Sequence, residues 1–166
     1  AGAINLIAIG ASTGGTEALA EVMKNLRPPM PGIVVVQHIP PMFSRLFAQR
    51  LDSEGSLDVK EAESGDAVLP NHAFVAPGNY QLRVKRCGGR YLLECSEGAR
   101  VDGHAPSVDV LFDSVALSAG ASALGVILTG MGADGAKGLL AMRQAGARTL
   151  GQDEASSVVY GMPRAA

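Results

Sequence analysis

The chain has 166 residues, of which 47% are hydrophobic and 18% charged, and its formal net charge is −2. This length and composition favour one globular domain with a substantial aliphatic core and exclude an intrinsically disordered chain. The charge balance gives no basic surface of the kind that binds nucleic acid or anionic membranes, and no apolar run is long enough to span a bilayer.

The first part of the chain alternates continuous aliphatic runs with amphipathic segments. Strands are expected at residues 4–9, 33–37 and 57–62, and helices at 16–26 and 43–51. Because helical segments separate the apolar runs at this spacing, the pattern predicts a parallel sheet with right-handed crossovers.

The middle of the chain has the pattern of an antiparallel excursion. A short strand at 73–76 precedes a predicted hairpin formed by 80–86 and 90–95. Cys87 and Cys95 flank its turn, so they could face each other across the hairpin, or they could be two ordinary reduced cysteines.

The parallel pattern then returns after a polar loop. Ser107 is expected to cap a helix that ends near residue 119, and 124–129, 136–145 and 149–151 read as strand, helix and short strand. The whole pattern is typical of an α/β fold with a mainly parallel sheet and an added hairpin.

A possible nucleophile stands between the first strand and the first helix. Gly10-Ala11-Ser12-Thr13-Gly14 fits the pattern G-x-S-x-G, which places a serine at the carboxyl edge of a strand near the N–H groups of the next helix. The alternative is a glycine turn, or a helix N-terminus that binds phosphate, with Ser12 as its cap.

Two further residues at strand ends could complete a serine hydrolase triad. His38 follows a strand that should neighbour the first one, whereas His72 precedes a strand and His104 lies in a loop that the sequence does not place. Asp134 follows strand 124–129, at the edge where parallel sheets hold their ligands, and could orient the imidazole.

Asp134 also has a simpler interpretation as the N-cap of the helix that begins near Gly135. Asp153 and Glu154 are rival acids, because they too follow a strand. The segment Gly130-Met131-Gly132 could supply backbone N–H groups to an oxyanion.

The order serine, histidine, aspartate differs from that of α/β-hydrolases, in which the histidine comes last. The sequence has no P-loop and no histidine and carboxylate spacing typical of a metal site, so neither a cofactor nor a metal is expected. Gly130 to Gly135 fits G-x-G-x-x-G, but only Asp153 and Glu154 could supply the acidic residue of a dinucleotide site.

Several collinear motifs together resemble the catalytic domain of the bacterial chemotaxis protein-glutamate methylesterase family, CheB. The resemblance covers nearly the whole chain and is carried by Ile9–Gly15, Gln37–Pro40, Ala76–Gly78, Pro106–Phe112, Leu128–Gly135 and Gln152–Glu154. It implies a three-layer α/β/α, doubly wound, mainly parallel sheet with an added antiparallel hairpin.

The resemblance also implies an activity and its residues. The family hydrolyses glutamate γ-methyl esters on chemoreceptor helices and deamidates receptor glutamines with a serine, histidine and aspartate, which correspond to Ser12, His38 and Asp134. The backbone amide of Met131 is associated with the oxyanion site. Thr13 is expected beside it, where its side chain could orient His38 or close the turn, or simply cap the helix.

The resemblance implies that residues 1–166 form the methylesterase catalytic domain, without the family's receiver domain and without its last helical segment. Chemoreceptor helices are the expected substrate partner and the receiver domain a partner within the longer protein; we expect a cytoplasmic monomer that neither enters the membrane nor binds nucleic acid. A nucleotide- or phosphate-binding module and a non-catalytic receptor-docking domain are the alternatives.

Overall fold

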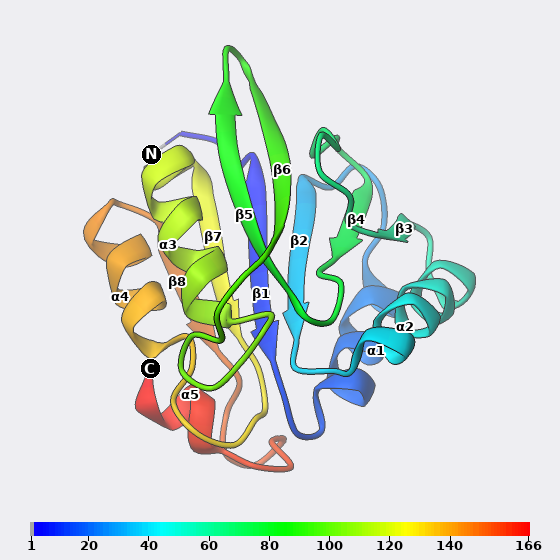
Figure 1. Cartoon of the computed structure of the whole chain (residues 1–166), viewed down its shortest axis with the longest axis vertical. Coiled ribbons are helices and arrows are strands. Elements are labelled where there is room, and N and C mark those ends of the chain that lie inside the picture. The colour runs from blue at the N-terminus through cyan, green and yellow to red at the C-terminus, as the bar shows by residue number, and fades with distance from the viewer. Residues whose placement is uncertain (1) are drawn as a thin grey trace.

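The computed structural model describes residues 2–166 and contains a six-stranded parallel sheet with the strand order β3-β4-β2-β1-β7-β8 (Figure 1). The strands of this sheet are β1 Leu6–Ala11, β2 Gly32–Gln37, β3 Asp58–Glu61, β4 His72–Val75, β7 Ala123–Ile127 and β8 Arg148–Gly151. The hairpin strands are β5 Tyr80–Cys87 and β6 Arg90–Glu97. The helices are α1 Gly15–Asn25, α2 Pro41–Glu54, α3 Val108–Ser118, α4 Ala136–Gln144 and α5 Gly161–Ala165, with one 3₁₀ turn at Gly120–Ser122.

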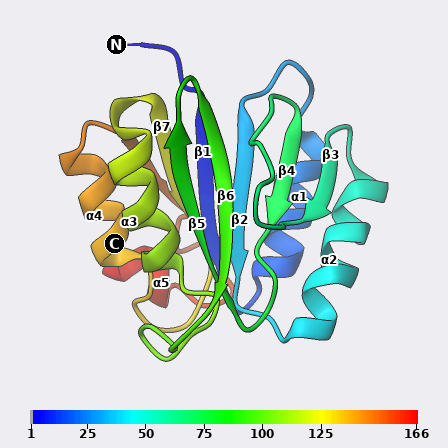
Figure 2. The ribbon, with the colours of Figure 1, turned by 45° about the horizontal axis from the view of Figure 1, so that its top comes forward.

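Two hydrophobic layers lie on opposite faces of the sheet, because successive strand residues point to opposite sides. Ile7 and Ile9 of β1 pack with α1 and α2, whereas Leu6 and Ala8 pack with α3, α4 and the hairpin. Figures 1 and 2 show α1 and α2 on one side of the sheet and α3, α4 and the β5–β6 hairpin on the other. This arrangement confirms the predicted three-layer, doubly wound fold.

The predicted elements are all present, with ends shifted by a few residues. One of these shifts affects the site: β1 continues to Ala11, beyond its predicted end at residue 9, because Gly10 and Ala11 still pair with β2. The structure adds the short helix α5, which follows the last predicted strand. None of the helices within residues 2–166 is long and apolar enough to cross a membrane.

The suggestion that the two cysteines face each other is wrong. The two-residue turn sets the hairpin register, which pairs Cys87 with Arg90 and Cys95 with Leu82. Both thiols are free, and burial raises the pKa of Cys95 to about 11.

The direction of the chain across the sheet reverses at β1. The chain runs from β1 to β2 and the strands beyond it, then returns to β7 on the other side of β1. Ligands of doubly wound sheets bind at the carboxyl ends of the strands beside such a reversal. The segments after β1, β2 and β7 therefore meet at one edge, and they contain Ser12, His38 and Asp134.

Gly10 is required where α3 crosses β1. A Cβ atom added there would collide with the two γ-methyl groups of Val108. We therefore expect Gly10→Ala to lower the free energy of unfolding by about 1–3 kcal/mol, the usual cost of overpacking. Urea unfolding would measure it. The double variant Gly10→Ala/Val108→Ala should lose less free energy of unfolding than the sum of the losses in the two single variants. Strict additivity of the two losses would contradict this explanation.

Candidate active site

Ser12 and His38 stand side by side, each one residue beyond the end of its strand. The ladder pairs Ala11 with Gln37, and the N–H of His38 donates to the carbonyl of Ala11 at 3.1 Å. Leu6 and Ala8 of β1, and Val34 and Val36 of β2, face the α3 side of the sheet. By the same alternation, Ser12 and His38 point to the α3 side.

Asp134 reaches the same place from the loop after β7, and its carboxylate receives four hydrogen bonds. Oδ1 accepts from Ser107 Oγ at 3.0 Å and from the N–H of Asp109 at 2.9 Å. Oδ2 accepts from the N–H of Val108 at 2.8 Å and from Nε2 of His38 at 2.6 Å. The side chain of Asp134 is only 2% exposed, so these donors replace the water that it lacks.

This environment favours the charged form of Asp134. Burial raises its pKa, but the hydrogen bonds from His38 and from the first N–H groups of α3 outweigh burial and hold the pKa below its ordinary value. The N-terminus of α3 also favours a negative charge. The interpretation of Asp134 as a cap of α4 is wrong, because its carboxylate caps α3 and the N-cap of α4 is Gly135.

The hydrogen bond to Asp134 fixes the tautomer of neutral His38. An ionised carboxylate can only accept, so Nε2 of His38 carries the proton and Nδ1 keeps a lone pair. Nδ1 is buried and has no hydrogen-bond partner in the described chain, and no hydrogen bond joins Ser12 Oγ to His38 there. The imidazole therefore has one free basic atom, and catalytic pairs are often this loose before substrate binds.

Gln37 ties the two neighbouring residues together through their main chains. Its Nε2 donates to the carbonyl of Ser12 at 2.8 Å and to that of His38 at 3.3 Å. Gln37 is 3% exposed and lies on the α1 side, where its Oε1 lies close to Gly15. The sequence analysis assigns no role to Gln37, whose signal is that of a lone polar residue at the end of an aliphatic strand.

Two backbone N–H groups without acceptors among residues 2–166 belong to residues next to Ser12 and Gly130 in the chain. A Cβ atom added at Gly130 would lie 2.9 Å from Cβ of Ser12, so the two backbones touch. The next residue, Met131, has a side chain that points largely into solvent, with 65% of the residue exposed, and its N–H has no acceptor in the described chain. The N–H of Thr13 is likewise free, and Thr129 Oγ1 donates to the carbonyl of Thr13 at 3.0 Å.

The Thr13 side chain is exposed, and no side chain caps α1. The helix-capping alternative for Thr13 is therefore wrong. Thr13 lies in the turn that the N–H of Gly15 closes by donating to the carbonyl of Ser12 at 2.7 Å, and no hydrogen bond joins its side chain to His38 in the described residues.

The rival residues lie elsewhere. Asp153 is exposed and accepts a hydrogen bond from the N–H of Ser156 at 3.0 Å, and Glu154 is exposed. His72 begins β4, at the amino end of the sheet, as the sequence suggested.

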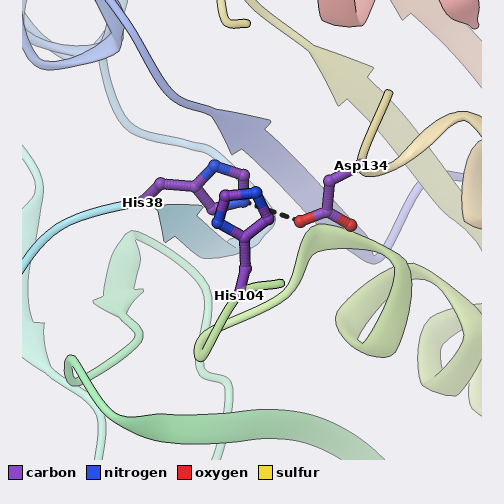
Figure 3. Close-up of side chains that lie close together, drawn as sticks. All are labelled: His38, His104 and Asp134. Carbon is purple, nitrogen blue, oxygen red and sulfur yellow. Dashed lines mark hydrogen bonds and ion pairs between the residues drawn. The ribbon is translucent and has the colours of Figure 1, made fainter. Parts of the chain in front are cut away.

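The sequence did not place His104, and the structure stacks it on His38, with ring centroids 3.6 Å apart and the planes 7° from parallel (Figure 3). The two histidines line a cavity of about 240 Å³ with Asn79, Arg100 and neighbouring prolines. A sequence signal existed in Asp102-Gly103, the dipeptide of a tight hairpin turn that ends at His104.

Two clusters have the composition of metal sites. Ligand atoms of His38, His104 and Asp134 lie within 4.8 Å of one another, as do those of Asp102, Asp109 and Asp134. Parallel stacked imidazoles cannot direct two in-plane lone pairs at one ion, and the oxygens of Asp134 already accept four hydrogen bonds. Neither cluster fits a metal ion well.

A family profile described as CheB methylesterase matches residues 7–166. The chain belongs to the CheB methylesterase family. It is 59% identical over 161 residues to protein-glutamate methylesterase/protein-glutamine glutaminase 2 of Syntrophomonas wolfei, an alignment that covers 97% of this chain and 47% of that protein. It is 57% identical to the Escherichia coli K12 protein-glutamate methylesterase/protein-glutamine glutaminase, with 97% and 46% covered.

The CheB fold is equally clear from a solved structure. The Thermotoga maritima CheB methylesterase catalytic domain superposes with a TM-score of 0.95 at 37% identity, covering 99% of this chain and 87% of that one. The chain spans about half the length of the curated CheB relatives, whose names describe whole proteins.

Asp109, beside Asp134, is a buried carboxyl group with an unusual ionisation. It is 6% exposed and accepts a hydrogen bond from the N–H of Gly138 at 2.7 Å. Burial, and then the neighbouring Asp102 carboxyl, raise its pKa from 3.8 to about 6, and the charge of Asp134 acts in the same direction. Folding therefore favours the protonated form of Asp109.

The contribution of protonated Asp109 to the free energy of unfolding should be fully present below about pH 4 and should be lost as the pH rises through about 6. Asp109→Asn keeps an acceptor for Gly138 without ionising. We expect its free energy of unfolding to gain about 2–3 kcal/mol relative to the parent between pH 4 and pH 7.5. Urea unfolding at several pH values measures this, with exposed Asp58→Asn as control. Parallel pH profiles for parent and Asp109→Asn would contradict it.

Proposed function

We propose that this chain is a serine hydrolase domain that removes methyl groups from glutamate γ-methyl esters of bacterial chemoreceptors and deamidates receptor glutamines. The observation that supports it most is the buried pair of His38 and Asp134, which leaves Nδ1 of His38 without a partner on the side of the sheet that Ser12 faces. The relatives' names supply the substrate class.

The first half of the reaction forms an acyl-enzyme. Nδ1 of His38 takes the hydroxyl proton of Ser12 as Oγ attacks the ester carbonyl carbon. Asp134 keeps Nε2 protonated and stabilises the imidazolium. The N–H groups of Met131 and Thr13 donate to the oxyanion. The imidazolium then gives its proton to the departing methoxy oxygen, and methanol leaves.

The second half regenerates the enzyme. Nδ1 of His38 accepts a proton from a water molecule, whose oxygen attacks the acyl carbon. The tetrahedral intermediate collapses, Ser12 Oγ recovers the proton, and the receptor glutamate is released. A glutamine side chain follows the same path, except that ammonia leaves in the first half.

The whole protein's partners belong to the same proposal. Chemoreceptor helices are its macromolecular substrate, and a receiver domain is its regulatory neighbour in the longer protein. We also propose that the domain acts in the cytoplasm as a monomer. Phosphate or nucleotide binding is less well supported, because such a site would not need the pairing of His38 with Asp134.

The test of the triad is methanol release from methylated chemoreceptor membranes. We expect Ser12→Ala and His38→Gln to reduce the rate by at least about a thousandfold, since each removes a reacting group. Asp134→Asn should also reduce it strongly, because a neutral amide no longer selects the correct tautomer. Melting temperatures establish that each variant folds. Unchanged release by Ser12→Ala would rule out the mechanism, whereas receptor binding without turnover in the parent would favour a docking domain.

The oxyanion role of Met131 has its own test. Met131→Ala alters only an exposed side chain and should retain most of the parental kcat, because the backbone N–H remains. Met131→Pro removes that N–H and should lower kcat about a hundredfold or more. Methanol release measures both, with circular dichroism and melting temperature as folding controls. Equal rates for folded Met131→Pro and Met131→Ala would exclude this N–H from the oxyanion site.

A further inference from the structure

His104 stands out because its loop is built rigidly around it. Val101 and His104 exchange backbone hydrogen bonds, each 2.9 Å long, across a two-residue turn in which Asp102 and Gly103 both have positive φ. Such a turn defines the position of the residue that leaves it. The turn therefore defines the backbone position of His104.

A buried side chain anchors this loop to the hairpin. Gln81 of β5 is 2% exposed, and its Nε2 donates to the carbonyl of His104 at 2.9 Å. Its Oε1 accepts from the N–H of Ser107 at 2.8 Å, next to the start of α3. The carbonyl of Ala105 also accepts from the N–H of Asn79 at 3.0 Å. These bonds hold the C-terminal side of the loop on the hairpin and next to the start of α3, whose N–H groups bind Asp134.

The ring of His104 covers one face of His38, while Asp134 meets the edge of the same ring (Figure 3). Burial, and then the neighbouring His38, lower the pKa of His104, and Arg100 acts in the same direction. The carboxylates of Asp134 and Asp102 oppose this shift without cancelling it. His104 is therefore a neutral aromatic ring at neutral pH.

We propose that His104 is a positioning residue for catalysis: its neutral ring holds the plane of His38 and stabilises the imidazolium that forms when His38 takes the Ser12 proton. A π face attracts a cation placed over it, and the attraction grows where water is excluded. This inference rests on the proposed hydrolase function, in which His38 becomes charged only during the reaction. The benefit therefore appears in the transition state more than in substrate binding.

The test distinguishes the effect of the π face of His104 from the effect of the space that its side chain fills. His104→Leu fills similar space without a π face, and His104→Phe keeps a π face without a titratable nitrogen. We expect His104→Leu to lower kcat for methanol release about tenfold, equivalent to about 1.4 kcal/mol, with KM within about twofold of the parent. His104→Phe should stay within about threefold of the parental kcat. His72→Leu, at the opposite edge of the sheet, is the matched control and should leave kcat unchanged.

Two results of that experiment would overturn the inference. Equal kcat values for His104→Leu and His104→Phe would show that the ring acts only by packing or not at all. A loss confined to KM would place His104 in substrate binding instead. Melting temperatures of the variants establish that the comparison is made on folded protein.

A second measurement avoids the receptor substrate. Phenylmethanesulfonyl fluoride sulfonylates activated serines and releases fluoride, and intact-mass and peptide analysis give the rate of modification of Ser12. We expect the order parent, His104→Phe, His104→Leu, from fast to slow. A parent that is not modified at Ser12 would overturn the hydrolase proposal itself. Modification of the parent and of both His104 variants at one rate would overturn only the role of His104.

Discussion

The site depends on one buried charge, the carboxylate of Asp134. An ionised carboxylate that is withdrawn from water is stable only if donors surround it, and here they come from two separate parts of the chain, residues 107–109 and His38. The N–H groups of Val108 and Asp109 start α3, the hydroxyl of Ser107 precedes it, and Nε2 of His38 follows β2. The same contacts that satisfy the charge therefore fix the helix, the loop and the imidazole relative to one another.

The parallel ladder supplies the second constraint. Register alone places the residues after β1 and β2 next to each other, and the alternation of side chains directs both toward α3. Small residues then allow the backbones to approach closely: Gly10 lies against Val108, and Gly130 lies against Ser12. Side chains that are held by strands and by a capped helix keep their relative positions, which is what the proposed catalysis requires of Ser12, His38 and Asp134.

The two neighbouring carboxyl groups of Asp134 and Asp109 differ in their ionisation. Asp134 has enough donors to stay ionised, whereas Asp109, with burial dominating and the charge of Asp134 nearby, has its pKa raised to about 6. Such unequal carboxyl groups are a common feature of functional sites. The site thus carries one firm negative charge beside His38, and the stacked ring of His104 completes the surroundings of the imidazole.

The sequence by itself determined the order and type of the strands and helices, because aliphatic runs, helical periodicity and glycine turns are local signals. It also predicted that the segments holding Ser12, His38 and Asp134 would share one edge of the sheet, since the carboxyl ends of parallel strands must lie together. Only the tertiary structure decided which helix Asp134 caps, that Gln37 bridges two main chains, that the cysteines stay apart, and that His104 lies on His38. Each of these depends on a hairpin register, or on contacts between residues far apart in the chain, for which a single sequence carries no periodic signal.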